Sequence, residues 1–187
     1  AGGPLPLTGL RGGPPLLVAV MGACGGLTVD WVQEHLYWID EEWGNIVMAT
    51  LDGSHPRVVY ANHTLMSAIA VDAVRRHIFW VEGTLVRKKP LSFSVEIKMA
   101  SLRGDEVQTV ISLMNWPSRH FGKNFVLDVP EGKIYFQERT GKLMVSDYRG
   151  ESQEGVDVLL PAPVSFSITR GVLFWLNQVG EVSAQSK

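Results

Sequence analysis

Short apolar segments with a two-residue alternation recur along the chain, and turn residues separate them. In the first part of the chain these segments span 26–31, 35–40, 46–51 and 57–61. Trp43-Gly44-Asn45 and Asp52-Gly53-Ser54 stand between them, and an Asp-Gly pair between two apolar runs is a strong signal for a β-hairpin. Helical periodicity is absent, and Pro and Gly interrupt the chain every few residues. The pattern therefore predicts an all-β chain.

The same order of segments returns three more times along the sequence. Aromatic residues occupy one equivalent position in each copy, at spacings of 42, 56 and 39 residues: Trp38, Trp80, Phe136 and Trp175. Internal periods of this length indicate a repeat architecture. The strands expected in the later copies are 68–73, 77–82, 95–102 and 107–112, then 124–129, 133–138, 142–148 and 156–160, and finally 164–169, 171–177 and 181–186.

Four antiparallel strands in each repeat predict a β-propeller, in which every repeat forms one blade. Apolar residues alternate onto both faces of the second strand, as Leu36 and Trp38 do against Tyr37 and Ile39, so both faces need a cover. Stacking of neighbouring blades provides it. With a leading strand at 16–20, the chain holds about four blades' worth of strands in one propeller region over residues 1–187. Its expected parts are 16–61 (the leading strand and the first repeat), 62–113, 114–161 and a partial repeat over 162–187.

Composition narrows the class of protein further. Hydrophobic residues make up 45% and charged residues 19% of the 187 residues, which are ordinary values for a globular protein. The formal net charge of −2 gives no reason to expect a nucleic-acid partner. A single cysteine, Cys24, excludes an internal disulfide framework and a cysteine-rich zinc site. No run of about 20 apolar residues is present, so no membrane span is expected within this chain.

Three segments of the first repeat carry a family resemblance. Leu27-Thr28-Val29-Asp30-Trp31, Leu36-Tyr37-Trp38-Ile39-Asp40 and Leu51-Asp52-Gly53 resemble the YWTD, or LDL-receptor class B, repeat, and the later copies are degenerate versions of it. The family includes lipoprotein receptors, nidogen and sevenless-type receptor kinases. The resemblance implies a six-bladed propeller, which needs roughly 270 residues. The chain is therefore expected to be a partial propeller or a fragment of a larger one, whose remaining blades or neighbouring domains would be its partners.

The resemblance also implies roles for two sets of residues. The aligned aromatics should be buried between adjacent blades, and the acid or amide that closes each copy should connect adjacent blades. The residues concerned are Trp38, Asp40, Trp80, Glu82, Phe136, Glu138, Trp175 and Asn177.

Two loops between second and third strands are candidates for ligand binding. Glu41, Glu42 and Trp43 form one of them, and the long segment Gly83–Val95, with Arg87, Lys88 and Lys89, is expected to be the other. Both should project from the same propeller face, and long loops on a rigid scaffold often carry binding residues. The alternatives are that the long segment is a solvated insertion and that Trp43 folds back over a blade edge.

Other motifs have competing explanations. Asn62-His63-Thr64 is a glycosylation sequon in an expected loop. Arg103-Gly104-Asp105 matches an integrin-type tripeptide, but it is better explained as the degenerate counterpart of Leu51-Asp52-Gly53. Five scattered histidines form no cluster that would indicate a pH switch: His35, His55, His63, His77 and His120.

Function follows from the resemblance, because the sequence shows no catalytic constellation and indicates neither a metal site nor a cofactor. The expected function is that of an extracellular, non-enzymatic propeller module of a cell-surface receptor or matrix protein, with a protein or peptide ligand. Two alternatives stay open. One is a calcium-dependent propeller hydrolase of the lactonase class, with Asp30, Asp72 and Asp128 in its central channel. The other is a structural spacer in a receptor-kinase ectodomain.

Overall fold

The computed structural model describes residues 24–88, 91–116, 125–138, 140–156, 165–176 and 180–186, and these form four antiparallel sheets. The expected leading strand at 16–20 lies outside these residues. Blade 1 consists of β1 (Cys24–Asp30), β2 (His35–Asp40), β3 (Asn45–Thr50) and β4 (Arg57–Ala61). Blade 2 consists of β5 (Leu65–Asp72), β6 (His77–Lys88), β7 (Leu91–Ser101) and β8 (Gln108–Trp116). Blade 3 consists of β9 (Phe125–Asp128), β10 (Lys133–Gln137), β11 (Leu143–Asp147) and β12 (Glu154–Gly155), and blade 4 of β13 (Ser165–Thr169), β14 (Val172–Leu176) and β15 (Val182–Ser186).

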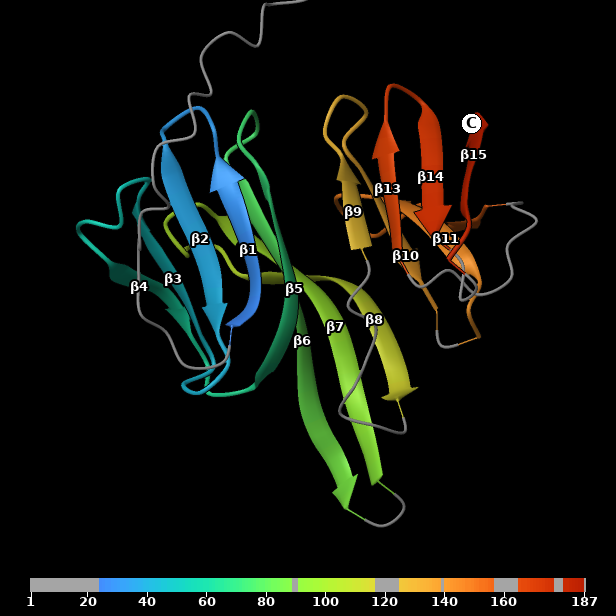
Figure 1. The fold of residues 1–187 in the computed structure, drawn as a ribbon. Coiled ribbons are helices and arrows are strands. Elements are labelled where there is room, and N and C mark those ends of the chain that lie inside the picture. Colours follow the sequence, from blue (N-terminus) through green and yellow to red (C-terminus); the bar gives the residue numbers. More distant parts are fainter. Residues whose placement is uncertain are drawn as a thin grey trace, which may run out of the picture.

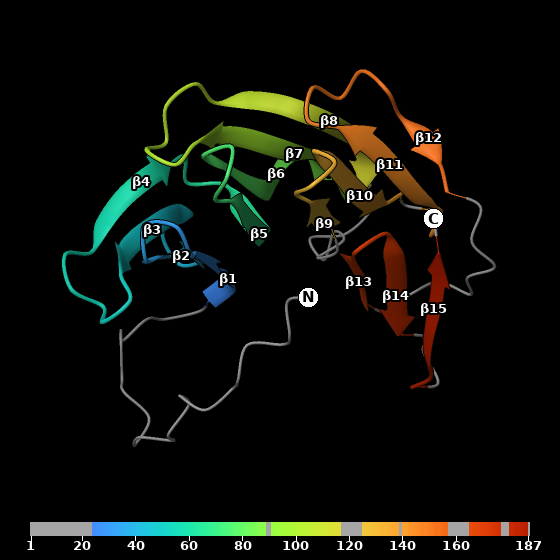
Figure 2. The ribbon, with the colours of Figure 1, turned by 90° about the horizontal axis from the view of Figure 1, so that it is seen from above.

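The four sheets follow one another along an arc, as the view from above shows (Figures 1 and 2). The first strand of each blade lies on the inner side of the arc, and strand order within each sheet follows chain order. Neighbouring inner strands contact one another, β1 with β5, β5 with β9 and β9 with β13. The residues that the structure describes contain no helix, and therefore none that is long and apolar enough to cross a membrane. The prediction of an all-β propeller with about four blades is confirmed.

Blade 2 differs from the expectation because its central hairpin is much longer. The segment Gly83–Val95 was expected to be a loop, and that was wrong: β6 and β7 continue through it, pairing Gly83 with Val95, Thr84 with Ser94 and Leu85 with Phe93. Val, Leu, Phe and Thr favour a pleated sheet, and Phe93 and Val95 are buried in the blade interface. The hairpin therefore projects beyond the other blades as an arm (Figure 1). A smaller difference is that β12 begins before the expected strand at 156–160.

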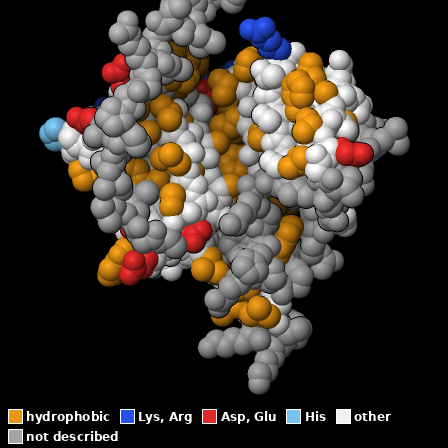
Figure 3. Space-filling view, in the orientation of Figure 1, with side chains coloured by type: hydrophobic (Ala, Val, Ile, Leu, Met, Phe, Trp, Pro, Cys, Tyr) orange, Lys and Arg blue, Asp and Glu red, His pale blue; other side chains and the backbone are white. Residues whose placement is uncertain are grey.

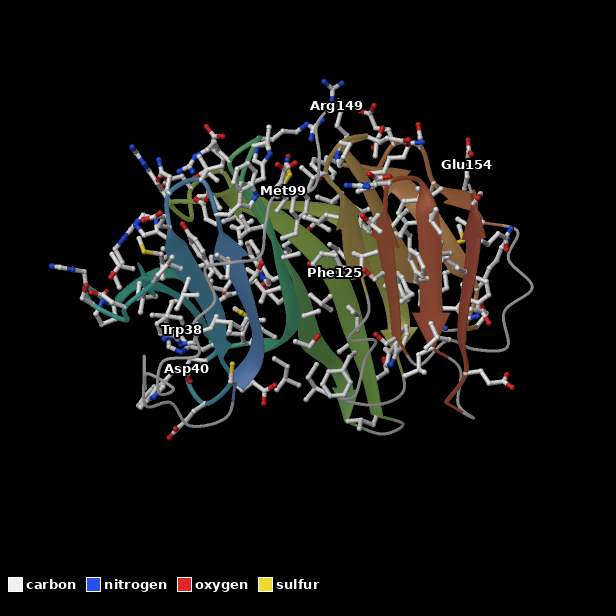
Figure 4. The ribbon with its side chains drawn as sticks, turned by 45° about the horizontal axis from the view of Figure 1, so that its top comes forward. Trp38, Asp40, Met99, Phe125, Arg149 and Glu154 are labelled. Atoms are coloured by element: carbon white, nitrogen blue, oxygen red, sulfur yellow. The ribbon has the colours of Figure 1, made fainter. Side chains whose placement is uncertain are left out.

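Apolar side chains fill the space between each pair of neighbouring blades. Three clusters follow the arc in order, the first between blades 1 and 2, the second between blades 2 and 3 and the third between blades 3 and 4. Met99 and Phe125 both belong to the second cluster, and Figure 4 shows them in the middle of the molecule. Within a strand the two faces serve two different interfaces, so that Trp80 packs toward blade 1 while its neighbour Phe79 packs toward blade 3. This explains the period-2 pattern in which both faces are apolar.

Two glycines allow the turn after the third strand to dock on the preceding blade. Gly104 and Gly150 both have a positive φ, at 88° and 78°. A Cβ atom at Gly104 would lie 1.7 Å from the carbonyl oxygen of Val59 in β4, and one at Gly150 would lie 1.9 Å from that of Val110 in β8. Only glycine permits so close a backbone approach together with this φ. Adjacent blades are thus held by backbone contact as well as by apolar packing.

Candidate functional site

The β2–β3 turn presents an exposed tryptophan on one rim of the propeller. Trp43 is 60% exposed, and Glu41 and Glu42 beside it are also exposed. Asp40 Oδ1 accepts hydrogen bonds from the backbone N–H groups of Glu42 (3.1 Å) and Trp43 (3.3 Å). These two bonds fix the backbone of the turn. Figure 4 shows Asp40 at the lower end of β2. The carboxylate of Asp40 stays inside its own hairpin in these contacts, so it does not join blade 1 to blade 2.

The connection between β4 and β5 supports the same turn from the side. His63 Nδ1 donates to the backbone carbonyl of Trp43 (3.1 Å), and the Asn62 N–H donates to that of Gly44 (3.4 Å). Gly44 has a φ of 61°, and a Cβ atom there would lie 2.7 Å from the carbonyl oxygen of Thr64. The turn is therefore wedged against residues 62–64. Because the backbone of the turn is held in this way, little backbone freedom is lost when Trp43 binds a partner, so the turn suits an anchor for a ligand.

A buried carboxylate beneath this rim joins blade 1 to blade 2. Glu82 is only 3% exposed and accepts hydrogen bonds from Tyr60 Oη (3.1 Å), Asn62 Nδ2 (2.7 Å) and Trp80 Nε1 (3.1 Å). Burial of the Tyr60 ring, followed by the negative charge of Glu82, raises the pKa of Tyr60 to about 12. The neutral phenol therefore remains a donor at any physiological pH. Tyr60 and Asn62 come from blade 1 and Glu82 from blade 2, so the network connects the two blades directly.

The basic candidates belong to the arm. Arg87 and Lys88 are the last residues of β6, and Lys89 lies outside the described residues. The arm and the β2–β3 turn both lie at the lower rim in Figure 1, but the arm extends well past the turn. Exposed aliphatic side chains accompany the cations, namely Leu85, Val86 and Leu91. Figure 3 shows hydrophobic side chains at this lower end. The two sets of candidates share a rim but do not form one compact cluster.

The sequon lies on this rim as well. Asn62 is exposed, and the hydrogen bond from its Nδ2 to Glu82 occupies one of the two hydrogens of the amide. The second hydrogen is the one that a glycan would replace. The geometry is therefore compatible with modification of Asn62 beside Trp43.

The opposite rim contains the aspartates of the alternative enzymatic explanation. Asp30 and Asp72 are fully buried. Asp30 Oδ1 accepts from the N–H groups of Val32 and Gln33, and Asp30 Oδ2 accepts from Arg76 of blade 2 at 2.9 Å. This pairing explains the burial of Asp30 without a metal ion.

Asp72 also contacts the next blade along the arc, but its arginine comes from its own blade and a tyrosine makes the contact between blades. Its Oδ2 accepts from Arg75 (3.1 Å) and from Tyr148 of blade 3 (3.0 Å), and Arg75 also donates to the backbone carbonyl of Val129. Burial of Tyr148, followed by the charge of Asp72, raises the pKa of the Tyr148 phenol. Within the described ranges, no group of three or more His, Cys, Asp or Glu side chains is arranged to hold a metal ion. Through these contacts, Asp30 and Asp72 each connect two neighbouring blades.

Sequence reasoning missed the partners in these connections. Arg75, Arg76, Tyr60 and Tyr148 were not candidates. The two arginines lie in the β5–β6 turn, Tyr60 lies in β4 and Tyr148 directly follows β11. A cation soon after the first-strand aspartate would have been a usable signal for Arg75 and Arg76. No local pattern indicates which blade a side chain reaches.

Two of the remaining expected residues, Phe136 and Trp175, are buried in the clusters between neighbouring blades. Glu138 accepts from Thr140 Oγ1 (3.4 Å) and closes its own turn, while Asn177 and His120 lie outside the described residues. The Arg103-Gly104-Asp105 turn is held by Ser101, whose Oγ accepts from the N–H groups of Arg103 and Asp105. Because Gly104 also packs against Val59, this tripeptide belongs to the blade interface.

Comparisons with known proteins agree with this architecture. No family model matches the chain. The vitellogenin receptor of Solenopsis invicta is 23% identical over 155 residues, covering 80% of this chain and 8% of the receptor, and protein cueball of Drosophila grimshawi is 30% identical over 142 residues, covering 71% of this chain and 21% of cueball. The chain thus spans only a small part of either relative.

Solved structures show the same fold. A chain of a nidogen/laminin complex superposes with a TM-score of 0.70 at 16% identity, covering 89% of this chain and 60% of that one. The computationally designed Ika4 protein gives a TM-score of 0.53 at 12% identity, covering 93% of this chain and 98% of the designed one. The blades and their connections define a β-propeller. Together with the similarity to the vitellogenin receptor and to cueball, they support a propeller of the YWTD, or LDL-receptor class B, repeat type.

Proposed function

We propose that this chain is an extracellular ligand-binding module of a cell-surface receptor or matrix protein, and that its ligand is a protein or peptide bound on the rim that carries Trp43. The relatives support this proposal, since one is named as a receptor and a solved neighbour comes from a complex between nidogen and laminin. The observation that carries it is the exposure of Trp43 on a turn fixed by Asp40, His63 and Gly44. An aromatic side chain on a fixed turn is well suited to anchor an interface.

Charges around the anchor favour a polar ligand surface. Glu41 and Glu42 directly precede Trp43, Arg87 and Lys88 end β6 on the arm, and Lys89 comes next in the sequence. The two groups have opposite sign, and surface pairs between them would be worth little to stability. Their more useful role is to orient a ligand that carries both signs of charge.

A displayed library of random peptides, selected on the whole chain, tests the proposal. Peptides that bind the wild-type chain should lose at least about tenfold in affinity on Trp43→Ala, which is about 1.4 kcal/mol. The matched control is Trp31→Ala, because Trp31 is 69% exposed but lies in the β1–β2 turn on the opposite rim. Equal losses on both variants, no loss on either, or a selection that enriches no peptide would each overturn the proposal.

We further propose that Asn62 carries a glycan in a secreted form of the protein. Its exposure and the second amide hydrogen support this modification. Expression in a glycosylating host, followed by intact-mass measurement of the wild-type chain and of Thr64→Ala, tests it. A hexose-containing mass increase that disappears in Thr64→Ala is the expected result, and identical unmodified masses would refute it.

The outer face of blade 1 supports a further proposal about partners. Leu27, Trp38, Val47 and Val58 form one cross-strand row on the face that points away from blade 2, and Leu27 and Val58 are more than half exposed. Such a row matches the rows that neighbouring blades cover elsewhere in the arc. We infer that a further blade of the propeller packs here in the longer protein.

A further inference from the structure

The arm has one edge that no neighbouring strand covers. On one side, β6 pairs with β7 as far as Lys88 and Leu91. On the other side, β5 begins at Leu65, which pairs with Gly83, so the partner strand ends there. Thr84–Lys88 therefore has no partner strand on its outer side in the described part of the chain. Figure 1 shows no other ribbon along this side of the arm. At the usual rise per residue the free edge is about 16 Å long.

This edge is accessible and still firmly attached to the core. Thr84 is exposed, and Leu85 and Val86 are 44% and 57% exposed. In β7, Phe93 pairs with Leu85 and Val95 pairs with Gly83 just before the edge, and both are buried in the cluster between blades 2 and 3. Exposed edge strands in natural proteins are normally short, covered or charged, because unpaired N–H and C=O groups recruit another strand. The free edge is anchored and carries two exposed aliphatic side chains, Leu85 and Val86, so it is suited to pairing with another strand.

The positive charge at the end of the free edge determines which kind of partner strand would pair with it. Arg87 and Lys88 follow Val86 directly in β6. A second copy of this edge would bring like charges together, which is unfavourable across a strand pair, whereas an acidic strand would pair favourably. A register shift at Val86 also adds local twist, which works against extended pairing between copies. These features disfavour self-association and favour a short acidic partner.

The position of β5 sets the direction of such a strand. A strand that continues the line of β5 upstream would run antiparallel to β6, with its N-terminal end beside Arg87 and Lys88 and its C-terminal end beside Thr84. Its C-terminal end would then approach Thr64, the residue that precedes β5 and packs against Gly44 of the Trp43 turn. One extended peptide could therefore contact both the arm and the Trp43 turn, which the sequence suggested separately.

We propose that the edge Thr84–Lys88 receives an extended segment of a protein ligand as an added antiparallel strand, acidic toward its N-terminus and apolar toward the end that reaches Trp43. Main-chain hydrogen bonds would supply affinity, and alternate side chains would supply specificity. This inference rests on the proposed function, because it names the ligand class and binding mode of the same rim.

The test uses the whole chain and a synthetic peptide with glutamates in its N-terminal half and alternating valine and threonine in its C-terminal half. Two N-methylated versions serve as controls, each methylated on one alternating set of backbone amides. An added strand points only one set at β6, so one version should lose at least about tenfold in affinity and the other should bind nearly as well. Fluorescence anisotropy measures binding, and amide hydrogen exchange should slow at residues 84–88.

Charge exchange provides the second arm of the experiment. The double variant Arg87→Glu and Lys88→Glu should weaken the acidic peptide and strengthen a lysine-substituted version of it, while Trp31→Ala should change neither. Equal binding of both methylated peptides, or slowed exchange at residues 41–45 without any at 84–88, would overturn strand addition and leave the Trp43 rim intact. Failure of the acidic peptide to bind at all would also overturn it, whereas the proposed function itself fails only in the library experiment.

Discussion

Blade 1 and blade 2 are built from the same repeat. Of these two, only blade 2 has a neighbouring blade on both faces in the described structure. Trp80 and Phe79 are adjacent in β6 and both fully buried, each against a different blade. In blade 1 the equivalent pair, Trp38 and Tyr37, is also buried, at 5% and 2% exposed. The cross-strand neighbours of Trp38 on its face differ, because Leu27 and Val58 are 60% and 52% exposed. The same sequence pattern thus produces the same strands, while burial depends on what stands beside the sheet. The period-2 pattern therefore predicts the strands of a blade, whereas packing against neighbouring blades buries the side chains and stabilises the sheet.

The apolar clusters and the polar hydrogen bonds that connect the blades also differ in the substitutions that they tolerate. The packed clusters accept similar apolar residues, whereas the polar connections depend on single atoms. Glu82 collects three donors from two blades, and Asp30 and Asp72 each bind an arginine together with backbone or phenol groups. Loss of one such acceptor leaves several buried donors without a partner, which is costly.

The largest expected effect is at the closed interface. Trp80→Ala removes a fully buried indole and should lower the free energy of unfolding by about 3–5 kcal/mol. Trp43→Ala is the matched control, because that exposed indole should contribute within about 0.5 kcal/mol. Urea unfolding followed by circular dichroism measures both. If Trp80→Ala cost less than about 1 kcal/mol, the space between blades 1 and 2 would not be a packed core.

A smaller effect distinguishes Glu82, which connects two blades, from Asp40, which caps its own turn. Glu82→Ala leaves the donors of Tyr60, Asn62 and Trp80 without an acceptor, and we expect a loss of about 2–3 kcal/mol. Asp40→Ala releases only two exposed turn amides and should cost about 0.5–1 kcal/mol. Glu82→Gln keeps one carbonyl acceptor and should fall between them. Equal losses for Glu82→Ala and Asp40→Ala would mean that Glu82 does not connect the blades.

Much of the fold could be predicted from the sequence, because strands and turns are local. The ranges 35–40 and 57–61 match β2 and β4, and the aligned aromatics marked every blade that the structure describes. The arm was not predicted as strand, because comparison with the short first-repeat turn made Gly83–Val95 look like an insertion. Its alternation of Val95, Phe93 and Leu91 was the available signal.

The candidate site was less predictable for a physical reason. Trp43 could be named from its turn and its flanking acids, and the structure places it on an exposed rim. The pairing of Asp30 with Arg76, or of Glu82 with Tyr60, joins residues 46 and 22 positions apart through the stacking of blades. Such contacts are determined by tertiary geometry, and no repeating pattern in a single sequence predicts them.

Alkaline titration provides a milder test of the closed interface. Burial, followed by the charge of Glu82, raises the pKa of Tyr60 from 10.0 to about 12. A raised folded-state pKa stabilises the fold fully below the unfolded value, so this contribution should persist up to about pH 10 and disappear as the pH rises through about 12. Phenolate absorbance should show a late-titrating tyrosine that is missing in Tyr60→Phe. If the late-titrating absorbance were the same in the wild-type chain and in Tyr60→Phe while both stayed folded, the contact between Tyr60 and Glu82 would be refuted.

The smallest expected effect is on the open face of blade 1, and it sharpens the comparison with blade 2. Leu27 and Val58 are largely exposed, so Leu27→Ser and Val58→Ser should each change the free energy of unfolding of this chain by no more than about 0.5 kcal/mol. In a longer chain that carries a further blade on this face, the same side chains would be buried, and each substitution should then cost about 1–2 kcal/mol. Urea melts of both chains measure the difference. Losses above about 1 kcal/mol already in this chain would show that the face is covered without another blade, whereas equally small losses in both chains would place the added blade elsewhere.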